Sequence, residues 1–210
     1  MNEKVLNKYD VMSVAEGASV NSNTALLYVD EDRKELNMLY NFEGVSYGYL
    51  PGQFKAMNPK GYKLKGFKDI YTNWDSVFAR KGWGKIYLGN HDQPHMVTRW
   101  GNDAPEFENI SSEMLTTFLL TMHATPYYYF GDELAMNNIK FDIIEDYRDI
   151  ESINNYKRIK NAGGDMENLL KIKKFLPAII AEHLFNRMHR SMQVLQQAQL
   201  GLKLIRIIRR

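Results

Sequence analysis

The chain has 210 residues, of which 44% are hydrophobic and 12% aromatic, so it can bury a core and lacks the composition of a disordered protein. It contains no cysteine, which excludes a disulfide framework and thiolate metal sites. Charges run through the N-terminal segment, and no uncharged stretch is long enough to span a bilayer. We therefore expect no signal peptide and no membrane span, and we favour a cytoplasmic location.

The net charge of +2 hides an uneven distribution of charge along the chain. Residues 171–210 hold nine Lys or Arg and a single acid, Glu182, whereas the preceding residues hold 18 basic and 24 acidic side chains. The acidic balance of the first part argues against nucleic-acid binding. The two parts read like different proteins, and the sequence predicts a boundary near residue 174.

Short apolar runs alternate with helix-period segments over the first 150 residues. The runs that predict buried strands are residues 11–16, 37–42, 85–90 and 125–130. Two amphipathic helices are expected between the last three runs. The apolar face of the first helix holds Phe67, Ile70, Trp74, Val77 and Phe78. The second follows an N-cap at Ser111 or Ser112, and its face holds Met114, Leu115, Phe118, Leu119 and Met122. This order predicts an α/β fold with a parallel sheet and helical crossovers.

Polar residues follow three of the predicted strands. Glu16 ends the first run, His91 and Asp92 follow the third, and Asp132 and Glu133 follow the fourth. Ligands of parallel α/β folds bind beyond the carboxyl ends of the strands. Carboxylates on that rim suit glycoside hydrolysis, in which retaining enzymes use a pair about 5–5.5 Å apart, but also proton abstraction or metal binding. The spacing matches no compact metal motif, so we expect no metal.

Each of these candidates has a purely structural alternative. Glu16 suits a solvated loop residue or a helix cap, and His91 with Asp92 suits a turn in which Asp92 bonds its own backbone. Asp132 and Glu133 suit the start of a helix, where acids stabilise the helix dipole. The residue pattern alone therefore leads only to an α/β enzyme of hydrolytic type.

Three segments carry a family resemblance. "YLGNHDQPHMVTRWGND", residues 87–103, resembles the fourth signature region of the α-amylase superfamily, glycoside hydrolase family 13, as found in its oligo-1,6-glucosidase and α-glucosidase branch. "MSVAEG", residues 12–17, is similar to the third region, where a Glu ends strand five. "TPYYYFGDELAMNNIKFDIIEDYRDIESINNYK", residues 125–157, resembles the strand-eight segment and the helical insertion after it. The resemblance extends to about residue 171 and implies a partial TIM (β/α)8 barrel, about strands five to eight.

The resemblance implies a role for each matching residue. Glu16 corresponds to the general acid/base, and Asp92 to the carboxylate that stabilises the transition state. His91 corresponds to the histidine that hydrogen-bonds the sugar in the cleaved subsite. Gln93 and the Asn41–Phe42 pair fall where the family lines the site. The implied substrate is an α-linked oligosaccharide, and the implied retaining mechanism uses no cofactor and no metal.

The nucleophile of the family is not found in this sequence. It is an Asp in an Arg-x-Asp context on strand four, and no Arg-x-Asp precedes Glu16. The resemblance therefore implies a C-terminal half barrel with two open strand edges, and we expect no turnover from this chain alone. The alternatives are a transglycosylating or isomerising relative that acts on sucrose or trehalose, and a non-catalytic sugar-binding remnant.

Two residues depart from the family within the matched region. His95 stands where this branch usually has Arg, and Ala135 stands where it often has Gly. A neutral imidazole replaces a permanent cation at residue 95, so we expect weaker charge pairing at the rim of the site.

The basic tail, residues 175–210, does not resemble the family. Residues 175–180 can be written in codons that, read from the third base, give Ser-Ala-Arg-Asp-Asn, the sequence that the family has at this point. Similar agreement extends along the tail, and we interpret the tail as an out-of-frame translation. The alternative is a basic amphipathic helix that binds lipid or an acidic partner.

Overall fold

The computed structural model describes residues 2–50, 58, 61–138, 143–146 and 150–164. These residues belong to two compact units, one that ends at Asn138 and one that follows it. The second unit contains a short 3-10 helix, Ile144–Asp146, and helix α6, Ile150–Asn161. The predicted tail lies outside the described residues. No helix in the described part of the chain is long and apolar enough to cross a membrane.

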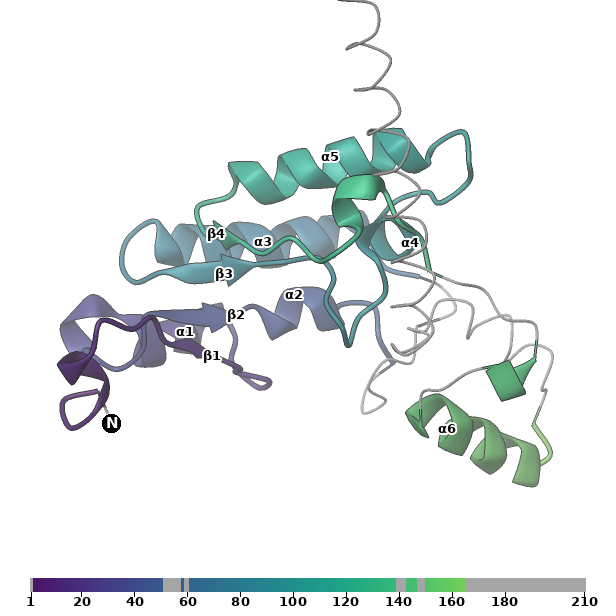
Figure 1. The fold of residues 1–210 in the computed structure, drawn as a ribbon, viewed down its shortest axis with the longest axis horizontal. Helices are drawn as coiled ribbons and strands as arrows, with labels where there is room; N and C mark the ends of the chain where they lie inside the picture. The colour runs from purple at the N-terminus through teal and green to yellow at the C-terminus, as the bar shows by residue number, and fades with distance from the viewer. Residues whose placement is uncertain (1, 51–57, 59–60, 139–142, 147–149, 165–210) are drawn as a thin grey trace, which may run out of the picture. The chain divides into compact units, whose positions relative to one another are not determined.

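The first unit is built on a four-stranded parallel sheet in the order β1-β2-β3-β4 (Figure 1). Its strands are β1 Val14–Ala15, β2 Met38–Tyr40, β3 Gly84–Ile86 and β4 Thr125–Pro126. Each strand falls in or overlaps a predicted run, and the predicted parallel order is confirmed. The strands are shorter than the runs because the chain leaves the ladder before the polar residues begin.

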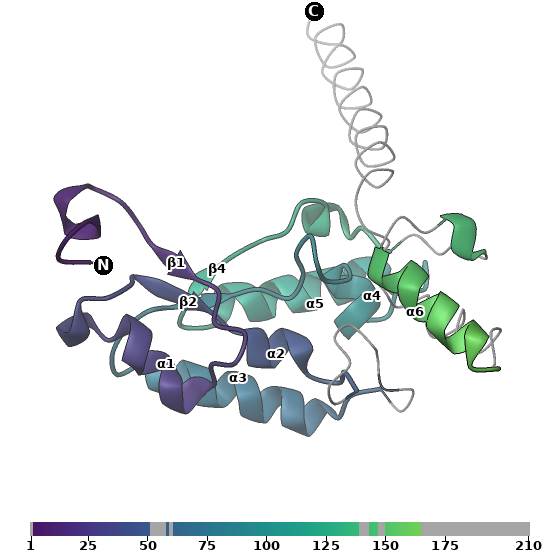
Figure 2. The same ribbon diagram turned by 90° about the horizontal axis from the view of Figure 1, so that it is seen from below.

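Helices connect the strands and pack against the sheet (Figures 1 and 2). The long ones are α1 Ser22–Val29, α3 Leu64–Phe78 and α5 Glu108–Thr121; α2 Phe42–Ser46 and α4 Met96–Trp100 are short. Single-turn 3-10 helices span Leu6–Lys8, Glu31–Arg33 and Asp132–Leu134. The architecture is thus a repeated strand-helix unit, as parallel connections require.

Two hydrophobic clusters hold the helices on one face of the sheet. The first joins α3, β3, α4 and α5 and consists of Phe67, Tyr71, Ile86, Leu88, Met96, Val97, Trp100, Leu115 and Leu119. The second joins α1, β2 and α3 and consists of Ala25, Val29, Leu39, Trp74 and Phe78. Helix α3 contributes to both clusters, so its predicted apolar face is confirmed.

The close approach of α3 to β3 depends on a glycine. A Cβ at Gly84 would lie 2.3 Å from the Phe78 ring, well inside van der Waals contact. Any larger residue at the first position of β3 would push the helix away from the sheet. Gly84 therefore fixes where α3 ends above the strand.

The start and the buried face of α5 differ from the prediction. The N-cap is Phe107, and Ser111 and Ser112 lie buried inside the helix, where Ser111 Oγ accepts a hydrogen bond from Asn102 N at 3.0 Å. The buried stripe runs through Ser111, Ser112, Leu115 and Leu119, so Met114 lies beside it and is 58% exposed. The sequence pattern suggests capping serines because caps favour Ser, but here tertiary contacts use the hydroxyls.

Helix α1 was not predicted, although its N-terminus carries a local signal. Asn21 Oδ1 accepts hydrogen bonds from the backbone N–H groups of Asn23 and Thr24 at 3.1 and 3.2 Å, and Thr24 Oγ1 accepts from Asn21 N at 3.2 Å. This reciprocal arrangement is a capping box. It satisfies backbone donors that would otherwise lack partners at the helix start.

Candidate active site

The residues after β3 form a turn that presents Asp92. Asn90 Oδ1 accepts a hydrogen bond from Asp92 N at 2.8 Å, and Asn90 O accepts from Gln93 N at 3.2 Å. The predicted turn is therefore present, but the amide side chain of Asn90 closes it. The carboxylate of Asp92 lies 3.1 Å from His91 Nε2, and the two side chains are 49% and 63% exposed. The pair is thus open to a ligand.

The chain beyond this turn is fixed by buried polar contacts. Gln93 is buried, and its Oε1 accepts a hydrogen bond from the hydroxyl of Tyr49. The guanidinium of Arg99 lies 4.2 Å from the centre of the Tyr49 ring and donates to the carbonyls of Val45 and Tyr47 at 3.0 and 2.9 Å. Gln93 is therefore held through Tyr49 in a network that ties the turn to the chain after β2.

His95 lies inside the protein and not at the exposed rim. Its Nδ1 is 3.1 Å from Asp132 Oδ1, and both side chains are almost fully buried. His95 N also donates to Asn138 Oδ1 at 2.8 Å. Asp132 does begin a helical turn, as expected, but its side chain pairs with a histidine that is distant in sequence. The pair joins the chain after β3 to the chain after β4.

Glu16 and Phe42 follow the neighbouring strands. Glu16 comes directly after β1 and is exposed, and within the described residues no hydrogen bond or ion pair joins it to Asp92. Phe42 is half-buried, with its ring centre 6.0 Å from that of Tyr40 and 6.5 Å from that of Tyr87. The preceding residue, Asn41, caps α2 by accepting a hydrogen bond from Gly44 N at 2.8 Å. Asn41 thus has a structural role.

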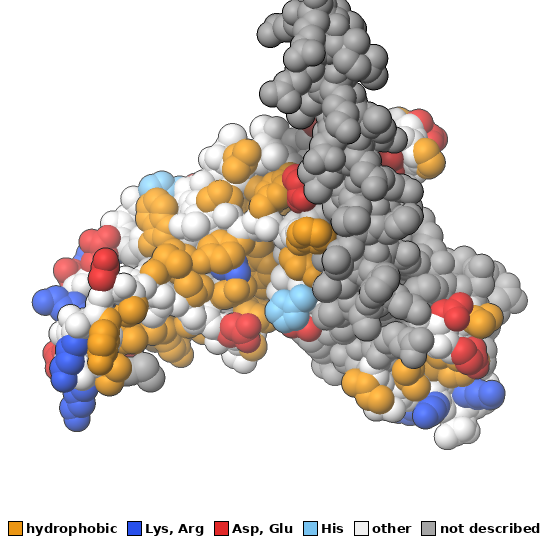
Figure 3. All heavy atoms as spheres, viewed as in Figure 1, with side chains coloured by type: hydrophobic (Ala, Val, Ile, Leu, Met, Phe, Trp, Pro, Cys, Tyr) orange, Lys and Arg blue, Asp and Glu red, His pale blue; other side chains and the backbone are white. Residues whose placement is uncertain are grey.

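The face of the sheet opposite the helices carries a buried cation. The ammonium of Lys85 lies 3.0 Å from the centre of the Tyr40 ring and 3.7 Å from that of Tyr127, and Tyr87 is 5.1 Å away. Burial lowers the pKa of Lys85 to about 8, although Glu16 acts in the opposite direction. Figure 3 shows hydrophobic side chains gathered over the strands, with a basic side chain enclosed among them.

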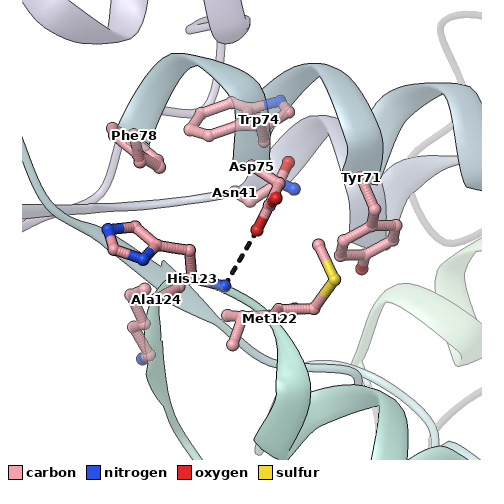
Figure 4. A pocket seen from close by; sticks show the side chains of 10 residues that line it. Asn41, Tyr71, Trp74, Asp75, Phe78, Met122, His123 and Ala124 are labelled. Carbon is pink, nitrogen blue, oxygen red and sulfur yellow. Dashed lines mark hydrogen bonds between the residues drawn. The ribbon is translucent and has the colours of Figure 1, made fainter. Parts of the chain in front are cut away.

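A small cavity between α3 and the sheet is not a sugar site (Figure 4). Tyr71, Trp74 and Met122 line it, and its volume is about 20 Å³. Asp75 Oδ1, also in its wall, already accepts a hydrogen bond from His123 N at 2.8 Å. The cavity has room for about one water molecule, whereas ligand pockets span roughly 300–1,000 Å³.

Comparison with known proteins places the chain in a family. The family model described as alpha amylase, catalytic domain, matches residues 1–175. The chain belongs to the α-amylase family, glycoside hydrolase family 13. The oligo-1,6-glucosidase of Parageobacillus thermoglucosidasius is 42% identical over 172 residues, which are 81% of this chain and 30% of that protein. The trehalose-6-phosphate hydrolase of Bacillus subtilis (strain 168) is 38% identical over 164 residues, or 78% of this chain and 29% of that protein.

Solved structures of this α-amylase family share the fold. Trehalose-6-phosphate hydrolase of Bacillus licheniformis superposes with a TM-score of 0.77 at 34% identity, over 84% of this chain and 32% of that one. Isomaltulose synthase from Klebsiella sp. LX3 gives a TM-score of 0.78 at 29% identity, over the same shares of the two chains. The chain therefore spans about a third of the length of these relatives. Its four parallel strands are consistent with part of an α/β barrel.

The sequence predicted that Glu16, His91 and Asp92 follow strands, but it did not predict the buried side chains near them. Lys85 and the tyrosines that surround it went unnoticed because "KIYLGN" reads as an apolar run. A lysine inside such a run was the available signal, since lysine is almost never fully buried without a reason. The contact of Tyr49 with Gln93 had no signal, because it joins residues 44 positions apart.

Proposed function

We propose that Glu16 and Asp92 are the general acid/base and the transition-state-stabilising carboxylate of a retaining α-glucosidase that hydrolyses short α-linked oligosaccharides. His91 and Phe42 bind the glucose ring at the cleaved bond, and Gln93, which is buried, holds the turn behind them through its contact with Tyr49. The observation that carries this proposal is the exposed His91–Asp92 pair on the turn after β3, in a chain of the α-amylase family.

The chemistry of the proposal requires two carboxyl groups with different duties. One must protonate the leaving oxygen and later activate water, and the other must stabilise the cationic ring. Glu16 and Asp92 follow parallel strands at the same edge of the sheet, where such folds bind ligands. The strands correspond to about strands five to eight of the barrel.

The 210 residues alone are proposed to be inactive. The retaining mechanism needs a nucleophilic carboxylate, and no Arg-x-Asp precedes Glu16 in this sequence. Purified chain mixed with 4-nitrophenyl α-D-glucopyranoside is expected to release no nitrophenol. Release above the level of a Glu16→Gln control would contradict the proposed inactivity.

The roles of the two carboxylates are testable in a hybrid enzyme. Residues 1–171 replace the matching segment of the Parageobacillus thermoglucosidasius oligo-1,6-glucosidase, so that the relative supplies the rest of the barrel. Glu16→Gln is expected to lower kcat for isomaltose by about 10²–10⁴-fold and to lower it less for the nitrophenyl glucoside. Nitrophenolate leaves without protonation, so the acid matters less for that substrate.

Controls separate catalysis from folding in the hybrid. Glu31→Gln changes an exposed acid of the 3-10 helix Glu31–Arg33 and is expected to leave kcat unchanged. Full activity in the Glu16→Gln hybrid would refute the acid/base role.

Preference for sucrose or trehalose over isomaltose would favour the transglycosylating or isomerising alternative, which the likeness to isomaltulose synthase supports.

A further inference from the structure

The register of the sheet places Glu16 and Lys85 in one row. Ala15 pairs with Leu39, so the next residue, Glu16, lies beside Tyr40. Tyr40 in turn pairs with Lys85 on β3. Glu16, Tyr40 and Lys85 therefore succeed one another across three neighbouring strands.

The alternation of side chains places the row on a single face. Ala15, Leu39 and Ile86 pack into the hydrophobic clusters under the helices. Successive residues of a strand point to opposite faces of the sheet. Glu16 and Lys85 alternate with these residues and point to the face away from the helices.

Burial of the Lys85 ammonium at this position is expected to lower the stability of the folded chain. It is 5% exposed, and its ammonium contacts aromatic rings, which attract a cation but replace water incompletely. Burial lowers the pKa of Lys85, and the charge of Glu16 raises it. The ionisable groups that face the ammonium are Tyr40 on β2, Tyr87 after β3 and Tyr127 after β4, and the charge of Glu16 after β1 also acts on it.

Tyr40 and Tyr87 supply rings and no charge in the range where Lys85 titrates. Burial raises the pKa of Tyr40 and of Tyr87 above the ordinary value. The hydroxyl of Tyr87 is buried and has no hydrogen-bond partner among the described residues. Glu16 is the acidic group whose charge raises the pKa of Lys85, and its side chain makes no hydrogen bond with the described part of the chain.

We propose that Lys85 is a positioning residue for Glu16: its ammonium, held in place by the rings of Tyr40 and Tyr127, attracts the Glu16 carboxylate toward the face of the sheet away from the helices. This inference rests on the proposed role of Glu16 as the acid/base. The side chain of Glu16 has no hydrogen bond within the described chain, so charge attraction gives it a preferred direction. Lys85 acts through Glu16 and need not touch the substrate.

The test measures the coupling between the two charges in the full 210-residue chain. The chain is produced with [ε-¹³C]lysine, Lys85 is assigned from the resonance that disappears in Lys85→Arg, and its pKa is read by NMR from pH 6 to 12. We expect the Lys85 resonance to titrate near pH 8 and that of Lys65, whose side chain is exposed and bonded to Asp69, to titrate above the ordinary pKa of 10.5.

Removal of the partner charge decides the outcome. Glu16→Gln is expected to lower the pKa of Lys85 by a further 0.5–1, roughly, since an attractive charge is lost. Glu31→Gln, the matched control, leaves the pKa of Lys85 unchanged. The proposal would be overturned if Glu16→Gln left the pKa of Lys85 unchanged, or if Lys85 and Lys65 had the same pKa. The readout involves no hydrolysis, so an inactive hybrid enzyme would refute the proposed function and leave the coupling standing.

Discussion

Two segments that follow strands carry the candidate carboxylates: residues 87–100 after β3, here called the β3 rim, and Glu16 after β1, here called the β1 rim. They present their carboxylates in different ways. Beyond Asp92 the chain is buried, and Gln93, His95 and Arg99 all have polar partners inside the protein. Beyond β1, Glu16 is exposed and lacks a hydrogen bond within the described residues. Packing thus fixes the chain around one carboxylate, whereas the other has no such contacts and, in our proposal, is oriented by the charge of Lys85.

This contrast fits the proposed roles of the two residues. A stabilising carboxylate works best when it is held in place before the charge develops on the substrate. An acid/base must face the leaving oxygen in one step and a water in the next, so it needs some freedom. We therefore expect substitutions at the β3 rim to change stability and substitutions at the β1 rim to change chemistry.

The largest expected loss of stability follows Trp100→Ala. Trp100 is buried at the end of α4, its ring packs 4.9 Å from that of Phe67, and its Nε1 donates to Leu88 O at 2.9 Å. Truncation leaves a large cavity and an unpaired carbonyl, so the free energy of unfolding should fall by about 3–5 kcal/mol. Urea unfolding followed by circular dichroism measures the change. A fall below about 1 kcal/mol would show that the β3 rim is not held by packing.

The next largest effect is a gain of stability in Lys85→Met. The folded pKa of about 8 lies below the ordinary 10.5, which corresponds to roughly 3 kcal/mol. Between these values the unfolded chain binds more protons, so native stability rises with pH across this window, and the full penalty is present below pH 8. The variant should therefore gain up to about 3 kcal/mol at pH 7 and little at pH 10.5.

A matched substitution controls for the added apolar surface. Lys65→Met removes a lysine whose side chain is 85% exposed and whose partner is Asp69, so no comparable gain is expected. An equal gain for Lys85→Met at pH 7 and pH 10.5 would mean that packing, and not charge burial, explains the effect. Urea unfolding at the two pH values separates these outcomes.

The parts of the fold that sequence reasoning anticipated are those with a local signal. The apolar face of α3 repeats at helical spacing, and Phe67, Trp74 and Phe78 are buried as predicted. Helix α1 has no such stripe of apolar residues that are all buried, since Leu27 and Tyr28 are exposed. The capping box at its N-terminus was therefore the local sequence signal for this helix. Strand order followed from the alternation of the elements, since parallel connections leave few topologies.

The candidate site divides in the same way. Asp92 and His91 are neighbours in sequence, and their contact needs only a local turn. The partners of His95 and Gln93 lie 37 and 44 positions away, so only the folded chain brings them together. We expected weaker charge pairing at residue 95 because a histidine replaces an arginine there. In the structure, His95 pairs with the buried Asp132, a partner that the sequence did not reveal.

A smaller effect on the β3 rim is expected for Tyr49→Phe. The ring remains over Arg99, but the hydroxyl that donates to Gln93 Oε1 is lost. The free energy of unfolding should fall by about 0.5–1.5 kcal/mol in urea titrations. Tyr28→Phe changes an exposed tyrosine of α1 and serves as the control, with no measurable change. Equal effects in the two variants would remove Gln93 from the network that fixes the rim.

The smallest effect on stability is expected for Glu16→Gln. The side chain is exposed and makes no hydrogen bond with a described residue, so the free energy of unfolding should change by less than about 0.5 kcal/mol at pH 10.5, where Lys85 is neutral in the folded chain and its attraction to Glu16 is absent. The same substitution should remove most of the activity of the hybrid enzyme, because a carboxamide neither donates nor accepts the catalytic proton. A loss of stability at pH 10.5 as large as that of Tyr49→Phe would place Glu16 in the packed framework and erase the contrast between the rims. Unchanged stability with lost activity would instead show that Glu16 serves catalysis and not folding. The burial of Lys85, which orients Glu16 in our proposal, would then be the part of this arrangement that lowers stability.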